Sequence, residues 1–115
     1  MAVIVDIDNT ILRDGIYPMQ SAISKVNSME DVFLVTGRSS LERTATVNTL
    51  RKWHVKYRML LMNIHGADES SMLRSKRAHA VVIQTTHHVT AAYDDNPMDR
   101  TMHKTLGIPA YPTLN

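Results

Sequence analysis

Residues 2–10 read Ala2-Val3-Ile4-Val5-Asp6-Ile7-Asp8-Asn9-Thr10, a short apolar run that ends in two carboxylic acids. The first four residues are apolar without alternation, which is typical of a strand buried on both faces of a sheet. Strands of this kind occur in parallel sheets that carry helices on both sides. The stretch therefore predicts a central strand over residues 2–5, with acidic side chains at its carboxyl end.

Short apolar runs alternate with amphipathic stretches along the rest of the chain. They predict further strands at residues 32–35, 59–62, 89–93 and 108–111. The first helix is expected from Pro18 to about residue 29, and the second from Leu41 to about Trp53, after a capping box of Ser39 and Glu42. The third helix is expected to begin at residues 68–71, and the fourth after Asn96-Pro97. The end of the third helix stays open, because residues 81–83 also suit a strand.

Five strands in strict alternation with four helices predict one α/β domain over residues 1–115. Right-handed crossovers then give a three-layer, doubly wound parallel sheet. Ligands bind to such sheets in the crevice beyond the carboxyl ends of the strands. Functional side chains are therefore expected directly after the strands.

Composition narrows the class of protein. The chain has 115 residues, no cysteine and a formal net charge of +2, which suits an anionic substrate without requiring nucleic acid. Disulfides and thiolate metal sites are excluded. No apolar window approaches the roughly 20 residues that span a bilayer, and no secretory leader is recognisable. We expect a cytoplasmic protein with no membrane partner.

Polar side chains follow three of the predicted strands. These are Asp6, Asp8 and Thr10 after the first, Thr36-Gly37-Arg38 after the second, and Asp94-Asp95 after the fourth, with Arg74, Lys76 and Arg77 near the start of the third helix. Four carboxylates at one edge of a sheet repel one another unless a cation lies among them. Oxygen ligands without cysteine or paired histidine favour Mg²⁺.

This order of motifs resembles the haloacid dehalogenase superfamily of phosphotransferases over essentially the whole chain. The matching residues are Asp6 and Asp8 in the D-x-D-x-T motif, Thr36 in the second motif, Lys76 in the lysine motif, and Asp94 with Asp95 in the acidic fourth motif. Asn9 stands where the family usually has glycine, and asparagine tolerates the left-handed backbone that the turn needs. Arg74 is the alternative match to the lysine motif.

The resemblance implies a Rossmann-like fold with little or no cap and a Mg²⁺-dependent phosphatase. Asp6 would attack phosphorus and form an aspartyl-phosphate, and Asp8 would act as general acid and base while its backbone carbonyl ligates the metal. Thr36 would bind phosphoryl oxygens, and Lys76 would offset negative charge. The implied substrate contacts are Thr10, Gly37, Arg38 and Arg74, and the implied metal ligands are Asp6, Asp8, Asp94 and Asp95. From the residues alone, Arg38 is equally a phosphate contact or a solvated charge.

The substrate is expected to be bulky, because residues 11–17 leave room only for a short flap. Within the superfamily the chain looks most like the 3′-phosphatase domain of phage polynucleotide kinases, through residues 35–38, 50–53, 93–96 and 106–108. The working hypothesis is a phosphatase of nucleic-acid 3′ ends. The alternatives are a nucleoside monophosphate phosphatase and a non-catalytic nucleic-acid-binding relative. Several basic residues could contact a strand, but no aromatic platform for base stacking is evident.

A phosphoacceptor receiver domain has the same fold type and a similar acid pair. Such domains accept phosphate on an aspartate at the end of the third strand, where this chain has Asn63 and no acid before Asp68. That hypothesis is therefore disfavoured. The six histidines show no metal-ligand spacing.

Overall fold

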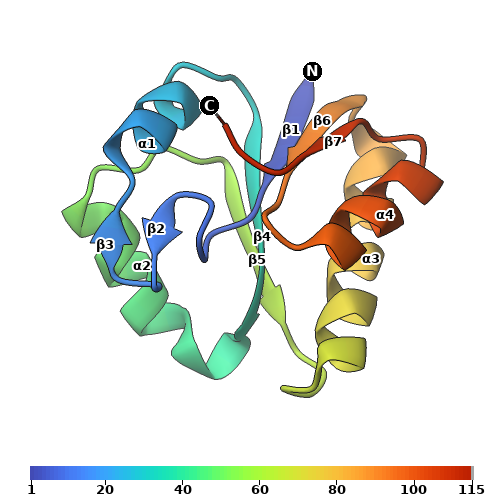
Figure 1. Ribbon diagram of the computed structural model, residues 1–115, viewed down its shortest axis with the longest axis horizontal. Helices are drawn as coiled ribbons and strands as arrows, with labels where there is room; N and C mark the ends of the chain where they lie inside the picture. The colour runs from blue at the N-terminus through green and yellow to red at the C-terminus, as the bar shows by residue number, and fades with distance from the viewer. Residues whose placement is uncertain (115) are drawn as a thin grey trace.

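A five-stranded, all-parallel sheet forms the middle layer of the computed structural model, which describes residues 1–114 (Figure 1). Its strands are β1 (Ala2–Val5), β4 (Val32–Ser39), β5 (Met59–Asn63), β6 (Val89–Tyr93) and β7 (Ala110–Tyr111). One face carries α1 (Gln20–Asn27) and α2 (Arg43–Lys52), and the other carries α3 (Glu69–Thr86) and α4 (Pro97–Thr105). The predicted three-layer, doubly wound α/β fold is confirmed.

The apolar strand residues are divided between two cores, one on each face of the sheet. In β1, Val5 packs in the core that includes Leu50 of α2, whereas Ile4 packs in the core that includes Ala80 of α3. Successive strand residues point to opposite faces, so a strand covered on both sides needs an apolar residue at every position. This explains the continuous apolar runs of the sequence.

The winding of the sheet reverses at β1, because the strand order is β5-β4-β1-β6-β7. The chain moves outward from β1 to β4 and β5, then crosses to β6 and β7 on the other side. At such a switch point the connections diverge and leave a crevice beyond the strand ends. Val5 is in register with Tyr93, and the Asp6 amide donates to the Tyr93 carbonyl at 2.9 Å. The register therefore brings Asp6 beside the residues that follow β6.

The predicted start of the first helix is wrong. Pro18 does not begin the first helix: it lies in β3 (Tyr17–Pro18), which pairs antiparallel with β2 (Leu12–Arg13), so the expected flap is a hairpin and α1 begins at Gln20. The sequence left residues 81–83 open between helix and strand, and they are helical, within α3. Ala80 and Ile83 are buried while Val81 and Val82 between them are exposed. Burial at a spacing of three residues is typical of one face of a helix.

The helix starts follow side-chain caps. The Asn96 side chain accepts from the amides of Met98 and Asp99, as predicted for α4. Ser39 accepts from the Leu41 amide, but the Glu42 side chain does not complete the capping box, and the 3₁₀ turn η1 (Ser40–Glu42) precedes α2. Within residues 1–114, no helix combines the length and apolar character needed to cross a membrane.

Leu50 and Leu41 allow one substitution to be compared at two extremes of burial. Leu50 is 0% exposed and Leu41 is 94% exposed. We expect Leu50→Ala to lower the free energy of unfolding by about 2–5 kcal/mol, because it leaves a cavity in the core. Leu41→Ala should change it by less than about 0.5 kcal/mol. Urea denaturation of both variants measures the difference, and similar losses would contradict the packing described here.

Candidate functional site

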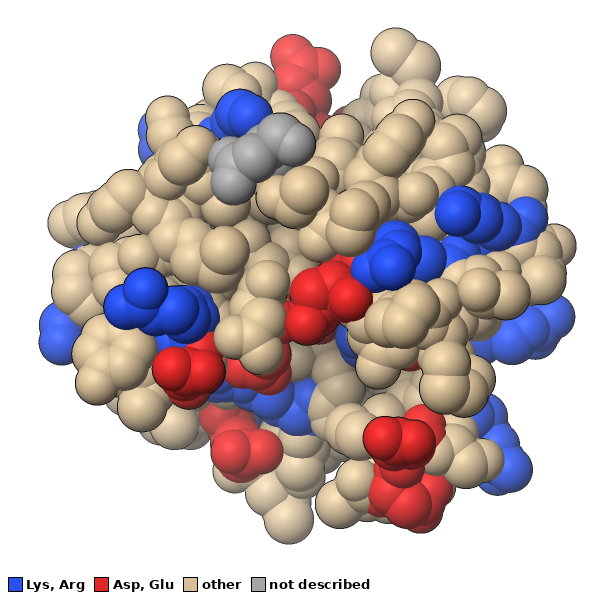
Figure 2. All heavy atoms as spheres, in the orientation of Figure 1, with Lys and Arg blue, Asp and Glu red and all other residues tan. Residues whose placement is uncertain are grey.

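A cleft of about 650 Å³ lies beyond the carboxyl ends of the central strands. Its charged lining consists of two cations, Arg38 and Lys76, and six carboxylates, Asp6, Asp8, Glu42, Glu69, Asp95 and Asp99. In Figure 2, acidic side chains gather in the middle of the face, with basic side chains on both flanks. The lining is therefore strongly negative, so an anionic ligand would be repelled unless a further cation accompanies it.

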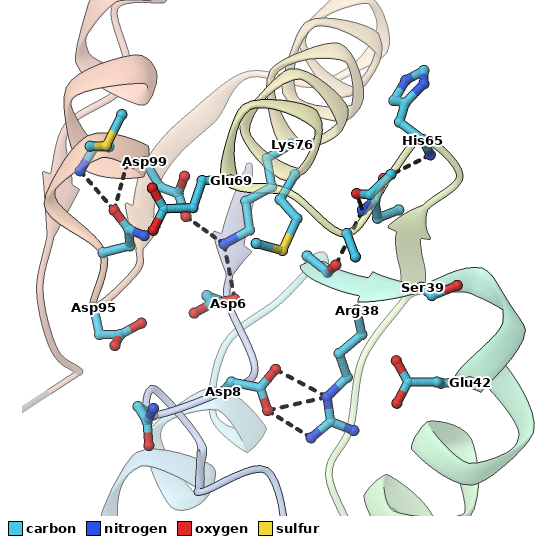
Figure 3. A pocket seen from close by; sticks show the side chains of 18 of the residues that line it. Asp6, Asp8, Arg38, Ser39, Glu42, His65, Glu69, Lys76, Asp95 and Asp99 are labelled. Carbon is cyan, nitrogen blue, oxygen red and sulfur yellow. Dashed lines mark hydrogen bonds and ion pairs between the residues drawn. The ribbon is translucent and has the colours of Figure 1, made fainter.

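Lys76 is a buried cation at the centre of this site. Its Nζ donates to Asp6 Oδ1 at 3.2 Å, Asp94 Oδ2 at 2.8 Å and Asp99 Oδ2 at 2.7 Å. Figure 3 shows the Lys76 side chain reaching from α3 to Asp6. All four side chains are less than a tenth exposed. Three carboxylates around one ammonium group leave an excess of buried negative charge.

Burial controls the protonation of these groups. Burial raises the pKa of Asp6 well above its usual value, with a smaller rise from the charge of Asp94, although Lys76 opposes both. Burial also raises the pKa of Asp94 to about 6, again against the effect of Lys76. Burial by itself would lower the pKa of Lys76, but the three surrounding carboxylates raise it above its usual value. Lys76 therefore stays charged, whereas Asp6 and Asp94 bind a proton more readily than exposed carboxylates do.

Three carboxylates converge on one point and could hold a metal ion there. One oxygen from each of Asp6, Asp94 and Asp95 lies within 4.8 Å of the other two. In Figure 3 the carboxyl groups of Asp95 and Asp6 point toward one another. Asp95 is exposed, so solvent and ligands can reach this side of the group. Such an all-oxygen set suits a hard divalent cation. The Asp8 side chain is not part of it.

Asp8 instead forms an ion pair with Arg38 at another side of the cleft (Figure 3). Arg38 Nε lies 3.1 and 3.0 Å from the two Asp8 carboxylate oxygens, and Nη2 donates to Oδ1 at 2.7 Å. The remaining contacts of the guanidinium are to Thr46 Oγ1 at 3.2 Å and the Gly15 carbonyl at 2.8 Å. Hydrogen bonding to Asp8 raises the pKa of Arg38. Arg38 is thus fixed in the cleft wall and is not a solvated charge.

The turn after β1 supports both acids. Asn9 has a φ of 59°, as the sequence predicted for an asparagine in place of glycine. Thr10 is buried, and its hydroxyl donates to Asp6 Oδ2 at 3.3 Å. Gly15 has a φ of 73°, and a Cβ there would lie 2.6 Å from Arg38 Nη2 and 2.9 Å from Asp8 Oδ1. The hairpin therefore sits directly against the Asp8–Arg38 pair.

The other predicted site residues differ in their access to the cleft. Thr36 is fully buried behind the wall, and its hydroxyl accepts from the Arg38 amide at 3.1 Å. Gly37 lines the cleft, where a Cβ would lie 3.0 Å from Met72 Sδ. Arg74 is exposed on α3 and does not line the cleft. Of the two candidates for the lysine motif, Lys76 is the one that contacts Asp6.

Sequence reasoning missed two residues with contacts at this site. Asp99 makes the shortest of the three Lys76 contacts, but in sequence it is only an acid in the first turn of a helix. Asn63 donates to the carbonyls of Gly37 at 3.4 Å and Gly66 at 2.7 Å, which ties the loop after β5 to the end of β4. A polar residue directly after a buried strand was the available signal for Asn63.

His103 was also missed as a buried residue. It is 1% exposed, and within residues 1–114 its Nδ1 has no hydrogen-bond partner. Burial lowers the pKa of His103 to about 4, with a further lowering from the charge of Lys76. The ring is therefore neutral at physiological pH and adds no cation to the site.

No known protein family and no curated protein matches this sequence. Solved structures with a similar fold include two chains of Pnkp1/Rnl/Hen1 complexes. A chain of the Pnkp1/Rnl/Hen1 RNA repair complex matches with a TM-score of 0.74 and 24% identity, over 96% of this chain and 41% of that chain. A chain of a second Pnkp1/Rnl/Hen1 complex structure matches with a TM-score of 0.71 and 25% identity, over 96% of this chain and 44% of that chain. This chain thus spans less than half the length of either neighbour. Both neighbours are chains of Pnkp1/Rnl/Hen1 complexes, the first of which is described as an RNA repair complex.

Metal binding at this site should depend on pH. The folded pKa of Asp94 is about 6, against an ordinary value of 3.8, so the stabilisation from its bound proton is lost as the pH rises through about 6. A divalent cation can then take the place of the proton. We expect Mg²⁺ to raise the melting temperature more at a pH well above 6 than at a pH well below 6. At a Mg²⁺ concentration of a hundred times Kd, the free energy of unfolding should rise by about 2.7 kcal/mol.

Calorimetry with and without Mg²⁺ measures this effect. Asp94→Asn should remove the stabilisation by Mg²⁺, whereas the exposed control Glu30→Gln should keep it. If Mg²⁺ stabilised Asp94→Asn as much as the unmodified protein, the metal would not bind at Asp94.

Gly15 and Gly107 provide a test of the hairpin contact. Both have positive φ, but a Cβ at Gly107 meets nothing within 4 Å. Gly107→Ala should cost about 1–2 kcal/mol of backbone strain. Gly15→Ala should cost about 1–3 kcal/mol more, because the methyl group collides with Arg38 and Asp8. Denaturant titration measures the free energy of unfolding of the two variants. Equal losses would show that the hairpin can move away from Arg38 and Asp8 without an energetic cost.

Proposed function

We propose that this chain is a Mg²⁺-dependent phosphomonoester hydrolase of the haloacid dehalogenase type, formed by residues 1–115 as one domain. We infer that it acts through an aspartyl-phosphate on 3′-phosphate ends of nucleic acid. The observation that carries the proposal is the environment of Asp6. This carboxylate lies at the switch point of the sheet, lines the cleft, contacts Lys76 and shares a possible metal position with Asp94 and Asp95.

Asp6 is held in position for attack on phosphorus. Lys76 fixes one of its carboxylate oxygens and Thr10 fixes the other. In the proposed first step an Asp6 oxygen bonds to phosphorus while the ester P–O bond to the leaving oxygen breaks. Lys76 offsets the negative charge that gathers between Asp6 and the phosphoryl group. Lys76 and Asp6 are both buried, and the low local dielectric strengthens the attraction between the ammonium group and this negative charge.

Mg²⁺ fits the oxygen-rich group of Asp6, Asp94 and Asp95, with the Asp8 backbone carbonyl as a proposed further ligand. When bound, it would neutralise carboxylate charge and act as a Lewis acid toward phosphoryl oxygens. The negative cleft lining gives an independent reason for a cation, because a phosphate dianion otherwise meets mainly carboxylates. Asp99 already contacts Lys76 and holds it toward the same point.

Asp8 has the position of a general acid and base for this reaction. It lies on the cleft wall opposite the Lys76 cluster and is partly exposed, so water and a leaving group can reach it. Its role would be to protonate the leaving oxygen and then to accept a proton from the water that attacks the aspartyl-phosphate. An incoming phosphate competes with Asp8 for the Arg38 guanidinium, because arginine binds phosphate and carboxylate with the same bidentate geometry. Arg38 would thus bind substrate and release Asp8 together.

An open cleft supports a large substrate. The only strands between β1 and α1 form the hairpin of β2 and β3, which is too small to be a cap domain, and its strand residues do not line the cleft. The fold shared with chains of an RNA repair complex also supports a nucleic-acid end as substrate. Arg74 is left out of the proposed site because it is exposed away from the cleft.

Replacement of Asp6 tests the mechanism. Asp6→Asn should lower Mg²⁺-dependent release of phosphate from a 3′-phosphorylated oligonucleotide by at least about a thousandfold, because an amide does not form the phosphoenzyme. Glu30→Gln, which makes the same chemical change at an exposed position, should keep full activity. Trapping of the phosphoenzyme by rapid acid quench and mass spectrometry should locate the phosphoryl group on Asp6.

The same assay separates the alternatives. Preference for mononucleotides over oligonucleotides would favour a nucleoside monophosphate phosphatase. Absence of turnover with every phosphate ester, together with retained oligonucleotide binding, would favour a non-catalytic nucleic-acid-binding protein. Undiminished hydrolysis by Asp6→Asn would refute the proposed nucleophile.

A further inference from the structure

Two cation–aromatic pairs lie on neighbouring segments, one on the β2–β3 hairpin and one at the end of α2. The Arg13 guanidinium lies 5.6 Å from the centre of the Tyr17 ring, and Lys52 Nζ lies 5.0 Å from the Trp53 ring. Trp53 Nε1 donates to the Ile16 carbonyl at 3.2 Å, which joins the two segments. Folding has therefore assembled an aromatic and basic surface from residues far apart in the chain.

This surface is continuous with the candidate site. The Gly15 carbonyl accepts from Arg38 Nη2 at 2.8 Å, so the hairpin turn touches the residue that is paired with Asp8. Tyr17 follows Gly15 by two residues, a backbone distance of about 7 Å at the rise of a strand. A ligand with one end in the cleft therefore passes the hairpin if it leaves on this side.

Both segments present accessible groups. Tyr17 is 52% exposed, and Arg13 beside it is exposed too. Arg51 and Lys52 are exposed at the end of α2. Trp53 is half-buried against the core and lines a separate groove of about 420 Å³. The same groove is lined by Gln20 and Ser24, whose polar side chains can hydrogen-bond a base. Asn27 also lines it, but its amide group is already hydrogen-bonded to the His54 carbonyl and the Lys56 amide. The nearby acid on the hairpin is Asp14.

We propose that this hairpin–helix surface, defined by Arg13, Tyr17, Lys52 and Trp53, binds single-stranded polynucleotide and leads its terminal phosphate into the cleft. The exposed Tyr17 ring stacks on one base, and the groove beside Trp53 receives another. Arg13 and Lys52 contact backbone phosphates. Aromatic rings interleaved with cations are the combination that binds single strands with little sequence preference.

The charge distribution supports this division of tasks. The cleft is lined mainly by carboxylates and suits one phosphate together with a metal ion, whereas the hairpin–helix surface is mainly cationic. A polymer can contact the cleft and the hairpin–helix surface at once, whereas a mononucleotide can contact only the cleft. The inference rests on the proposed function, which supplies the terminal phosphate that reacts in the cleft. It adds that the substrate is a polymer.

Trp53 is the single tryptophan of the chain and reports on binding directly. Unphosphorylated single-stranded RNA and DNA of about ten nucleotides, a length within the usual site size, are titrated into the metal-free protein. Because no turnover is involved, the result does not depend on phosphatase activity. We expect the oligonucleotide to quench Trp53 fluorescence, with an affinity that falls as salt rises.

Matched variants locate the surface. Tyr17→Ala and Lys52→Ala should each weaken oligonucleotide binding by about fivefold or more, as measured by anisotropy of a labelled strand. Tyr111→Ala, at a tyrosine that is 47% exposed on β7, and Lys104→Ala, at an exposed position of α4, should leave the affinity unchanged. Circular dichroism of every variant checks that it is folded.

The outcomes distinguish this inference from the proposed function. Equal affinity of Tyr17→Ala and Tyr111→Ala, or no binding by the unmodified protein, would overturn the hairpin–helix surface even if phosphatase activity is found. Selective loss of binding in Tyr17→Ala and Lys52→Ala would support it even if no phosphate ester is hydrolysed. A difference between the RNA and DNA titrations would identify the preferred polymer.

Discussion

The contact of one buried ammonium group with three carboxylates holds the site together. Lys76 of α3 joins Asp6 after β1, Asp94 after β6 and Asp99 of α4, so four separate segments meet at one atom. Loss of a partner from a buried ion pair typically costs about 3–5 kcal/mol, because the remaining charge is left uncompensated. The cluster is nevertheless short of positive charge. The same cluster shares Asp6 and Asp94 with the group of three carboxylates that could hold a metal ion.

Asp6 and Asp8 illustrate how environment separates two chemically identical groups. They stand two residues apart, yet Asp6 is buried beside Lys76 with a raised pKa, whereas Asp8 is partly exposed and paired with Arg38. Pairs of acids in contrasting surroundings are characteristic of sites that need a nucleophile and a proton donor together. The hairpin of β2 and β3 reinforces this difference, since Gly15 contacts Arg38 and leaves Asp6 untouched.

Several features were predictable because their causes are local. The continuous apolar runs indicated buried parallel strands, and Asn96 with Pro97 marked the start of α4. Asn9 was expected to adopt a left-handed backbone and does so. The rule that ligands bind beyond the carboxyl ends of parallel strands then brought the acids after β1 and β6 to one place. These predictions needed only side-chain sterics, periodicity and a general property of doubly wound sheets.

The sequence by itself thus determined the five strands of the main sheet, the Asn96 cap and the identity of the acids at the strand ends. Tertiary structure alone decided which side chains meet: Lys76 and Asp6 are 70 residues apart, Asp8 and Arg38 are 30 apart, and Trp53 reaches Ile16 across 37 residues. Pro18 belongs to a hairpin rather than a helix for the same reason, since pairing with Leu12 overrides its local preference. Such contacts depend on strand register and on the path of the crossovers, and neither is encoded in a short stretch of residues.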